Sequence, residues 1–489
     1  MFLGLDLGTT NVKAVVMDGE GTVVAQGAVG VERFHAEGGG IEQDIENIWQ
    51  GACRAIRQAL AGVDPAGIRA VGVSSQGGAV QLLDGAERPV GRVISWLDPR
   101  GQRWNEELTR RLGEEFFSAH VGHGSSAVAI GQILRLRHEQ PELLRPPARI
   151  GFVGDCIVKR LCGRGAHDAT SLSIAVLYNP SLRAADPEVL RVLGVGPDQL
   201  PDLLPPLAPA GVLGRQAGDA TGLPAGIPVS AAVHDQYAAA VGAGGVRPGD
   251  VCLGTGTAWV LLAATDRLAP PVTPGAFVCQ HLVDGVWGQL LSMCNGGSSV
   301  EWAMRLLGRG EPAVAKVDEL AASAPPGSGG LCFRPLLGTC PTAGPLADRG
   351  GQLDGITFAH GPDHLVRAVL EGLACELARH VLILARAGVT VERLLLSGGA
   401  ADSRVTPEIL ANVTGKPVTC LRRSAISAVG AAVLARAMIE GQTRLADLAV
   451  RLAPAGRTVL PDENATIYRR LLERYLEAFH GGPGGEQDS

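Results

Sequence analysis

An aspartate that follows an apolar run is the strongest candidate for a catalytic group in this sequence. Asp235 comes after the apolar residues 227–233 and opens an Ala-rich stretch, 237–242, that predicts a helix. A carboxylate between a strand and a helix faces the crevice in which α/β folds bind their ligands, and there it can accept a proton as a general base. The alternative is that Asp235 only caps its helix.

A glycine turn near the N-terminus predicts a phosphate site. Residues 6–13, Asp-Leu-Gly-Thr-Thr-Asn-Val-Lys, lie between two predicted strands. Glycine allows backbone N–H groups to face an anion, and hydroxyl, amide and ammonium groups add donors. Asp6, together with Asp235, has the oxygen ligands that Mg²⁺ prefers. The alternative is an ordinary hairpin turn.

A second turn of the same design, residues 254–257 (Gly-Thr-Gly-Thr), follows Asp235 by fewer than twenty residues. Two domains that each carry such a hairpin can hold one nucleotide between them, and closure would expel water from the site. Gly398, Gly399 and Ala400 follow an apolar run and permit close backbone approach to a ligand, although a tight strand–helix turn is an equal reading. The predicted ATP-binding residues are Thr9, Thr10, Asn11, Lys13, Gly254, Thr255, Gly256, Thr257, Gly398, Gly399 and Ala400.

Polar and aromatic residues at other predicted strand ends are candidates for contact with a polyol substrate, which needs donors and acceptors. They are Gln76, Gly77, Trp96, Asp98, Arg100, His234, Asp235 and His281. For most of them surface-loop chemistry is an equal alternative, and each histidine can equally be structural.

The elements around these residues repeat in the two halves of the chain. Apolar runs at 2–6, 12–18 and 23–25 predict a strand meander, followed by a helix at 44–61 and a strand at 68–73. The second half begins in the same way, with runs at 250–253 and 259–263. This order predicts an α/β protein of two actin-like (ribonuclease H-type) ATPase domains with a cleft between them.

The Gly/Pro-rich segment 244–249 predicts the boundary between these domains. We therefore expect a first domain over 1–245 with the base and the substrate side, a second over 246–450 with the nucleotide side, and a C-terminal helix with a disordered tail over 451–489. Residues 104–206 read as helices and loops inserted to build the substrate side.

Composition excludes several classes of protein. The chain has 489 residues, 46% hydrophobic and 19% charged, and a net charge of −6 with no Lys/Arg block, so nucleic acid is not an expected partner. No apolar run reaches the roughly 20 residues of a membrane span. Ten scattered cysteines without a C-x-x-C pair, and an N-terminus unlike a signal peptide, predict a cytoplasmic protein with reduced thiols.

Further segments resemble the FGGY family of carbohydrate kinases over residues 1–445. Residues 351–356 and 364–371 look like the family's C-terminal signature. The resemblance implies ATP-dependent phosphorylation of a sugar or polyol hydroxyl with Mg²⁺, a small-molecule partner and a homodimer. It places Asp235 at the catalytic base and Asp6 at the metal and phosphate position.

Xylulose kinases are the most similar members. Residues 96–100, Trp-Leu-Asp-Pro-Arg, are similar to their Trp-Asn-Asp-Gly-Arg, and His281 lies where they carry a histidine. A ketopentose such as xylulose is therefore the expected substrate, with ribulose, glycerol, erythritol or gluconate as alternatives. An actin-like ATPase switch and a non-catalytic sugar sensor are the alternatives of another class.

The chain also departs from the family. Xylulose kinases usually carry Gln-Met-His-Gly where this chain has Gln-Gly-Gly-Ala at 76–79, which suggests a pocket opened for a larger or differently oriented substrate. Residues 338–342, Gly-Thr-Cys-Pro-Thr, replace the family's Gly-Glu-Arg-Thr-Pro, and the first signature around 131–138 lacks its Lys and Trp.

Overall fold

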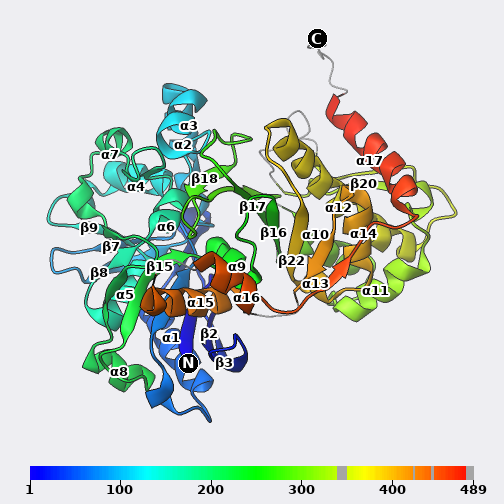
Figure 1. Cartoon of the computed structure of the whole chain (residues 1–489). Coiled ribbons are helices and arrows are strands. Elements are labelled where there is room, and N and C mark those ends of the chain that lie inside the picture. The colour runs from blue at the N-terminus through cyan, green and yellow to red at the C-terminus, as the bar shows by residue number, and fades with distance from the viewer. Residues whose placement is uncertain (294, 339–349, 422–424, 442–444, 481–489) are drawn as a thin grey trace.

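The computed structural model describes residues 1–293, 295–338, 350–421, 425–441 and 445–480. It has two lobes, each built on a mixed β-sheet, with helices on both faces (Figure 1). The tail 481–489, expected to be disordered, and most of the divergent segment 338–342 lie outside the described residues.

The first sheet starts with the predicted meander. Within the described ranges it has eight strands, ordered β13-β10-β15-β6-β1-β2-β3, with β14 beside β15. The parallel neighbours β15, β6 and β1 end at the same edge. The strands are β1 (Phe2–Leu7), β2 (Asn11–Met17), β3 (Val23–Gly30), β6 (Val71–Ser75), β10 (Ala166–His167), β13 (Asp202–Leu203), β14 (Pro209–Val212) and β15 (Pro228–His234).

The second sheet repeats this plan. Among the described residues its order is β18-β19-β17-β16-β22-β23-β24, so that β19, β17 and β16 form the meander and β22 lies parallel to β16. The strands are β16 (Asp250–Thr255), β17 (Trp259–Thr265), β18 (Phe277–Gln280), β19 (Trp287–Ser292), β22 (Arg393–Gly398), β23 (Val418–Cys420) and β24 (Arg457–Val459). The repeat confirms the expected two-domain α/β fold.

Smaller sheets complete the two lobes. One of five described strands, β4-β5-β8-β7-β9, belongs to the first lobe, and two others have two strands each. The strands are β4 (Phe34–Ala36), β5 (Gly40–Gln43), β7 (Val80–Leu83), β8 (Pro89–Ile94), β9 (Arg149–Phe152), β11 (Tyr178–Asn179), β12 (Ala184–Ala185), β20 (Cys332–Arg334) and β21 (Gln352–Asp354).

The inserted segment is shorter than expected. Helices α2, α3 and α4 do form an outer layer, but β9 joins the five-stranded sheet, β10 joins the first main sheet and α5 packs on β15. The expectation of an insertion over 104–206 is therefore wrong beyond β9. Short strands such as β10 carry too few residues to show a period of two.

Amphipathic helices cover the sheets. Asp44 caps α1 through hydrogen bonds from Glu46 N and Asn47 N, and the apolar face of α1 packs on β2 and β3. The helices are α1 (Ile45–Ala59), α2 (Gln102–Leu112), α3 (Glu114–Val121), α4 (Ala129–Glu139), α5 (Val153–Cys162), α6 (Ala169–Ile174), α7 (Pro187–Leu193), α8 (Arg215–Thr221), α9 (Asp235–Ala243), α10 (Gly297–Leu306), α11 (Val314–Ser323), α12 (Pro362–Arg386), α13 (Gly399–Asp402), α14 (Val405–Thr414), α15 (Ile426–Glu440), α16 (Leu445–Leu452) and α17 (Ala465–His480).

Helix α15 returns to the first lobe although it follows the second in sequence (Figure 1). It packs on β1, β6 and α9. A Cβ on Gly4 would lie only 1.8 Å from the Ala428 carbonyl oxygen, and one on Gly72 only 1.9 Å from that of Ala431, so the helix backbone lies directly on the sheet. A domain boundary at residue 245 thus remains a proposal, because residues of α15, which follow that boundary, complete the hydrophobic core of the first lobe.

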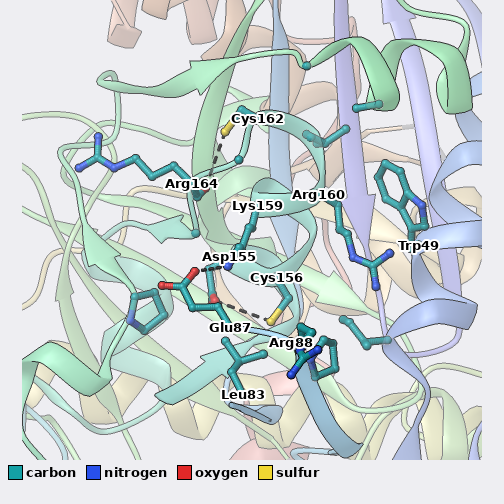
Figure 2. A pocket seen from close by; sticks show the side chains of 18 of the residues that line it. Trp49, Leu83, Glu87, Arg88, Asp155, Cys156, Lys159, Arg160, Cys162 and Arg164 are labelled. Carbon is teal, nitrogen blue, oxygen red and sulfur yellow. Dashed lines mark hydrogen bonds and ion pairs between the residues drawn. The ribbon is translucent and has the colours of Figure 1, made fainter. Parts of the chain in front are cut away.

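Helices α1, α5 and α8 cover the other face of the first sheet, where they also enclose a large cavity (Figure 2). None of the predicted site residues lines it. Within the described part of the chain, the cysteines are free and no helix is long and apolar enough to cross a membrane.

Candidate active site

Three predicted segments meet at one edge of the first sheet. Asp6 on β1 lies opposite Ser74 on β6, and on the other side of β6 Val233 and His234 lie opposite Ser74 and Ser75. Asp235 follows as the first residue of α9. Sheet register therefore brings Asp6 and Asp235 to the same edge of the sheet, on either side of β6, as the apolar runs before them predict.

The two carboxyl groups influence each other. Ser74 Oγ donates a hydrogen bond of 2.9 Å to Asp6 Oδ1. Burial, and then the negative charge of Asp235, raise the pKa of Asp6 to about 7, and burial raises the pKa of Asp235 to about 6. Two carboxylates that disfavour each other's charge fit a hard divalent cation, whose positive charge would relieve both.

A cation here would need ligands beyond these carboxylates. Among the described residues, no group of three or more His, Cys, Asp or Glu side chains can hold a metal ion.

Asp235 does not cap its helix. The N-cap position belongs to His234, which makes no side-chain capping bond, and Asp235 lies in the first turn. Burial lowers the pKa of His234 to about 3, so that its ring is neutral, and its Nε2 lies 3.2 Å from Asp235 Oδ1. A neutral ring with its proton on Nε2 can orient the carboxylate without holding it in an ion pair.

The second predicted loop and the 398–400 turn form one unit. Thr255 on β16 pairs with Gly398 on β22. The Thr255 hydroxyl donates to Ser397 O at 2.6 Å and accepts from Ala400 N at 3.1 Å. Gly398 has φ +89°, and a Cβ there would lie 2.7 Å from Thr255 O, so only glycine allows this close approach.

The two halves of the site meet through a residue that the sequence does not single out. A Cβ built on Gly254 would lie 3.4 Å from Gln236 Oε1, so the second loop lies against the first turn of α9. Gln236 follows Asp235 in the sequence, but its type alone gives no sign of this role. Asp6, Asp235 and the Gly254–Thr255 turn therefore face one site.

Thr9 has a different role from the one predicted. Its hydroxyl donates to Gln76 Oε1 at 3.0 Å and accepts from the Trp96 indole Nε1 at 2.9 Å. The single proton of the Thr9 hydroxyl is therefore already used in a bond within the protein. Gln43 Nε2 donates to Thr9 O, and Gln76 Nε2 donates to Gln43 Oε1. The Thr9 side chain thus links the first glycine turn to Gln76 and Trp96. Gln43 was missed because no motif marks it.

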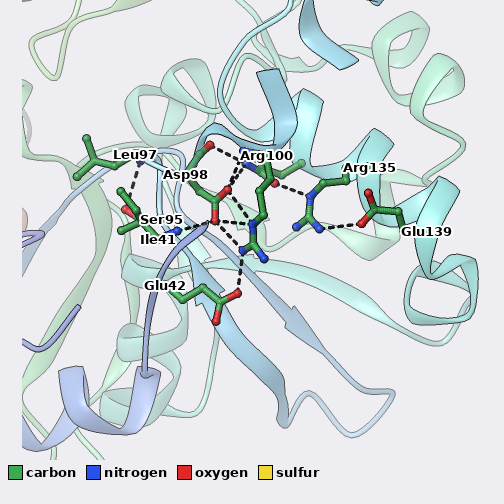
Figure 3. Close-up of polar contacts among 9 residues, drawn as sticks. Ile41, Glu42, Ser95, Leu97, Asp98, Arg100, Arg135 and Glu139 are labelled. Carbon is green, nitrogen blue, oxygen red and sulfur yellow. Dashed lines mark hydrogen bonds and ion pairs between the residues drawn. The ribbon is translucent and has the colours of Figure 1, made fainter. Parts of the chain in front are cut away.

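Asp98 and Arg100 serve the scaffold, which corrects the prediction that Asp98 contacts substrate (Figure 3). Both Asp98 carboxylate oxygens accept from Arg100, and Ile41 N and Gln132 Nε2 add further bonds. Arg100 also pairs with Glu42 at 2.7 Å. This network ties β5 to α4 and leaves Asp98 no oxygen for a ligand, whereas Trp96, 48% exposed, reaches Thr9.

The two glycines after Gln76 do not open the pocket, which corrects another expectation. A Cβ on Gly77 would lie 2.6 Å from Ile174 Cγ2 and 2.7 Å from His234 Cδ2, and one on Gly78 would lie 2.1 Å from Val128 Cγ1. These side chains fill the space that larger residues would take. Sequence could not show this, since Val128 and Ile174 come from distant segments.

His281 follows β18 in the second lobe but lies beside α9. Its ring centroid is 5.5 Å from that of Tyr237, whose ring is 6.2 Å from that of His234. Tyr237 OH, His281 Nε2 and His234 Nδ1 are buried and have no partner among the described residues. A buried polar atom without a partner is costly, so these atoms point to bound water or ligand hydroxyls.

A small apolar groove opens beside the second loop. Its volume is about 120 Å³, and Thr255, Gly399 and Ala400 form part of its wall. Most of the remaining lining comes from α10, α11, α12 and α14, which sequence analysis did not select because each contributes only one to three residues without a motif. The other lining residues are Trp259, Gly297, Val300, Pro312, Val314, Val317, Asp318, Leu370, Ser403 and Thr406.

The predicted ATP-binding residues thus fall into two groups. Thr10 and Asn11 are exposed at the first turn, with Lys13 behind them on β2, and Gly256 and Thr257 are exposed at the second. Gly254, Thr255, Gly398, Gly399 and Ala400 are joined by strand pairing and by the Thr255 hydrogen bonds.

Comparisons with known proteins agree with the fold. The model of the FGGY family of carbohydrate kinases, N-terminal domain, matches residues 1–242, and that of its C-terminal domain matches residues 249–439. The xylulose kinase of Escherichia coli K12 is 28% identical over 97% of this chain and 99% of its own. The glycerol kinase of Gloeobacter violaceus is 31% identical over 88% of this chain and 87% of its own.

A solved structure gives the same result. The xylulose kinase of Rhodospirillum rubrum superposes with a TM-score of 0.88 at 28% identity, covering 98% of both chains. With two family models that together span most of its length, the chain belongs to the FGGY family of carbohydrate kinases, phosphotransferases that act on an alcohol group.

Proposed function

We propose that this kinase transfers the γ-phosphoryl group of ATP to a hydroxyl of a small sugar or polyol, and that the substrate is a ketopentose such as xylulose. The observation that carries the proposal is the position of Asp235, a desolvated carboxylate next to Asp6 and to the Gly254–Thr255 turn. Its pKa of about 6 leaves it mostly ionised at neutral pH yet basic enough to take a proton.

In the proposed reaction Asp235 accepts the proton of the substrate hydroxyl. The hydroxyl oxygen then forms a bond to the γ-phosphorus, the bond from that phosphorus to the β-phosphate oxygen breaks, and ADP leaves. His234 orients the carboxylate through its Nε2 contact of 3.2 Å. Backbone N–H groups of the two glycine turns stabilise the charge on the phosphate oxygens.

Each ligand has its own side of the site. The apolar groove beside Thr255 suits a flat purine, and the 398–400 turn lies between that groove and the phosphates. Mg²⁺ would be held by Asp6 and Asp235 and would neutralise phosphate charge when bound. Tyr237 and His281 offer hydrogen-bonding atoms to a polyol from the other side.

The packing around Gly77 and Gly78 supports a small substrate. Ile174, His234 and Val128 take up the volume next to these glycines. A pocket in which side chains already fill the space beside these glycines favours a substrate of pentose size over a larger sugar acid. The similarity to xylulose kinases points the same way.

The test is ADP release with Mg-ATP over D-xylulose, D- and L-ribulose, L-xylulose, glycerol, erythritol, gluconate and fructose. We expect strong stimulation by one ketopentose and none in the Asp235→Ala variant. Stimulation by gluconate or glycerol alone would replace the substrate assignment but keep the reaction. ATP hydrolysis that no acceptor stimulates would overturn the proposed reaction.

A further inference from the structure

A cavity of about 740 Å³ lies on the face of the first sheet covered by α1, α5 and α8 (Figure 2). Its walls come from these helices, from the turn between β7 and β8, and from β9. It contains no residue of the candidate active site. Its size is in the usual range for small-molecule sites.

The charge of this cavity is opposite to that of the chain. The whole chain has a net charge of −6, yet six cationic side chains line the cavity against three acidic ones. The cationic residues are Arg88, Arg149, Lys159, Arg160, Arg164 and Arg215, and the acidic residues are Glu87, Asp155 and Asp202. Lys159 is one of only four lysines in the sequence.

Two of these cations share a single carboxylate. Arg149 Nη1 pairs with Glu87 Oε1, and Lys159 Nζ pairs with Glu87 Oε2. All three side chains are about 30% exposed, at 30%, 29% and 31%. One positive charge therefore remains uncompensated at a partly desolvated position, where its interaction with an anion is stronger than at an open surface.

The backbone presents Glu87 to these cations in an uncommon conformation. Glu87 has φ +57°, and Asp84 holds the turn by accepting from Ala86 N and Arg88 N. Few residues other than glycine adopt this region, and they do so where the surroundings enforce it. The turn thus places one acid at the point where an anionic ligand would otherwise bind.

The other cations are less available, with one exception. Arg164 pairs with Asp202, Arg88 with Asp84 and Arg160 with Glu46. For Arg215 no ion pair is found among the described residues. Burial raises the pKa of Asp155 to about 7, so this acid cancels only part of the positive charge.

The cavity also has an apolar wall. Ile45 and Trp49 from α1, Leu83 from β7 and Leu161 from α5 line it, and Figure 2 shows the Trp49 ring beside Arg160. Such a wall can pack against a carbon skeleton while the cations hold an anionic group. A lone inorganic ion would leave most of this volume unused.

We propose that this cavity is a second ligand site, which binds a small phosphorylated metabolite with its phosphate at Arg149 and Lys159. The phosphate would take over the charge-assisted hydrogen bonds that Glu87 now accepts. This proposal is independent of the substrate proposed for the cleft, because it uses other residues and a binding readout.

The experiment is calorimetric titration of the full chain with ribose 5-phosphate, with saturating Mg-ADP present to occupy the cleft. Ribose is the control ligand without phosphate. Lys159→Gln and Arg149→Gln remove one cation each, and Glu87→Gln removes the competing carboxylate. The matched control is Arg191→Gln on α7, which removes an arginine that pairs with Glu188 on the surface.

We expect saturable binding of ribose 5-phosphate and none of ribose. Affinity should fall about tenfold or more in Lys159→Gln and Arg149→Gln, since each loses a charge-assisted bond. It should rise in Glu87→Gln and stay unchanged in Arg191→Gln. The gain in Glu87→Gln distinguishes loss of a ligand contact from mere loss of structure.

The proposal is overturned by the absence of saturable binding with a dissociation constant below about 1 mM. It is equally overturned if ribose binds as well as ribose 5-phosphate. Binding that Glu87→Gln, Lys159→Gln and Arg149→Gln leave unchanged would place the ligand elsewhere. Melting curves of each variant check that it is folded.

Discussion

The first and second glycine turns occupy the same position in two repeated sheets but differ in charge. The turn between β1 and β2 is flanked by Asp6, Lys13 and Asp235, and the turn between β16 and β17 has no charged residue within 254–257. The first is braced by Gln76 and Trp96, the second by the Gly398 turn. The repeated fold thus sets where a loop lies, and its neighbours determine what it can do.

In the proposed function this difference in charge gives the two turns different roles. The first turn and its charged neighbours (the charged half of the site) accept the proton and hold the metal. The second turn and the Gly398 turn (the neutral half) bind the nucleotide through backbone groups and one hydroxyl. Substitutions in matched positions can separate the two roles, because those in the charged half should change turnover and those in the neutral half should change affinity for ATP.

The largest effect is expected from Asp235→Asn. The amide cannot accept the hydroxyl proton, so kcat should fall by roughly 10²–10⁴ while ATP affinity changes little. Steady-state kinetics with the best sugar measures this, and Asp219→Asn, at an exposed acid of α8, is the control. Turnover within threefold of the unmodified enzyme, about 0.7 kcal/mol, would contradict a base at this position.

A large effect on the neutral half is expected from Gly398→Ala. The new Cβ would lie 2.7 Å from Thr255 O at a φ of +89°, a strain of about 1–3 kcal/mol that disturbs the Thr255 bonds. KM for ATP should rise about 5- to 150-fold.

Gly399→Ala provides the matched control, because a Cβ there meets no atom within 4 Å. ADP binding measured by calorimetry should be weakened in the first variant and not in the second. Equal behaviour of the two variants would mean that the 398–400 turn does not contact the nucleotide.

The pH profile tests the charged half. Because the pKa of Asp235 is raised to about 6, its carboxylate is ionised above that pH and protonated below it. kcat/KM for the sugar should therefore fall about tenfold per unit as the pH drops below 6. Saturating Mg²⁺ should move this limb to lower pH.

His234 is the control for that profile, since burial already keeps its pKa at about 3. His234→Gln should retain the acidic limb, with its midpoint moved only slightly. Disappearance of the limb in this variant would assign the titration to the histidine and not to Asp235.

The smallest effect, and the finest test of the comparison, comes from Thr9→Val and Thr255→Val. Thr9 joins the first turn to Gln76 and Trp96, so its loss should raise the sugar KM about fivefold, the size of one hydrogen bond. Thr255 bonds only within the second lobe, so its loss should raise the ATP KM alone. If both variants change the same KM, the two turns do not serve different ligands, and the proposed separation of their roles is wrong.

Local patterns predicted the strand ends of the site well. Asp6, Asp235 and Gly254 each follow an apolar run, and parallel strands that end at one edge bring such residues together. Hydrophobic periodicity and capping residues are enough to locate these elements, as Asp44 at the start of α1 shows.

Interactions between distant segments were not predictable. The filling of the Gly77 and Gly78 space depends on Ile174 and Val128, and the occupation of the Thr9 hydroxyl depends on Gln76 and Trp96. A sequence pattern reports which residues are buried or polar, and not which partner each of them meets. The same limit applies to α15, whose small apolar residues predict burial without naming the sheet it covers.

The contact of α15 with β1 has a consequence for how the protein is made. β1 is synthesised first, and the helix that closes its exposed face is synthesised only after all described strands of the first sheet and all but β24 of the second. Until then Gly4 and Gly72 lie on an uncovered surface. The first lobe is therefore translated first, but its core is completed only once residues 426–440 have been made.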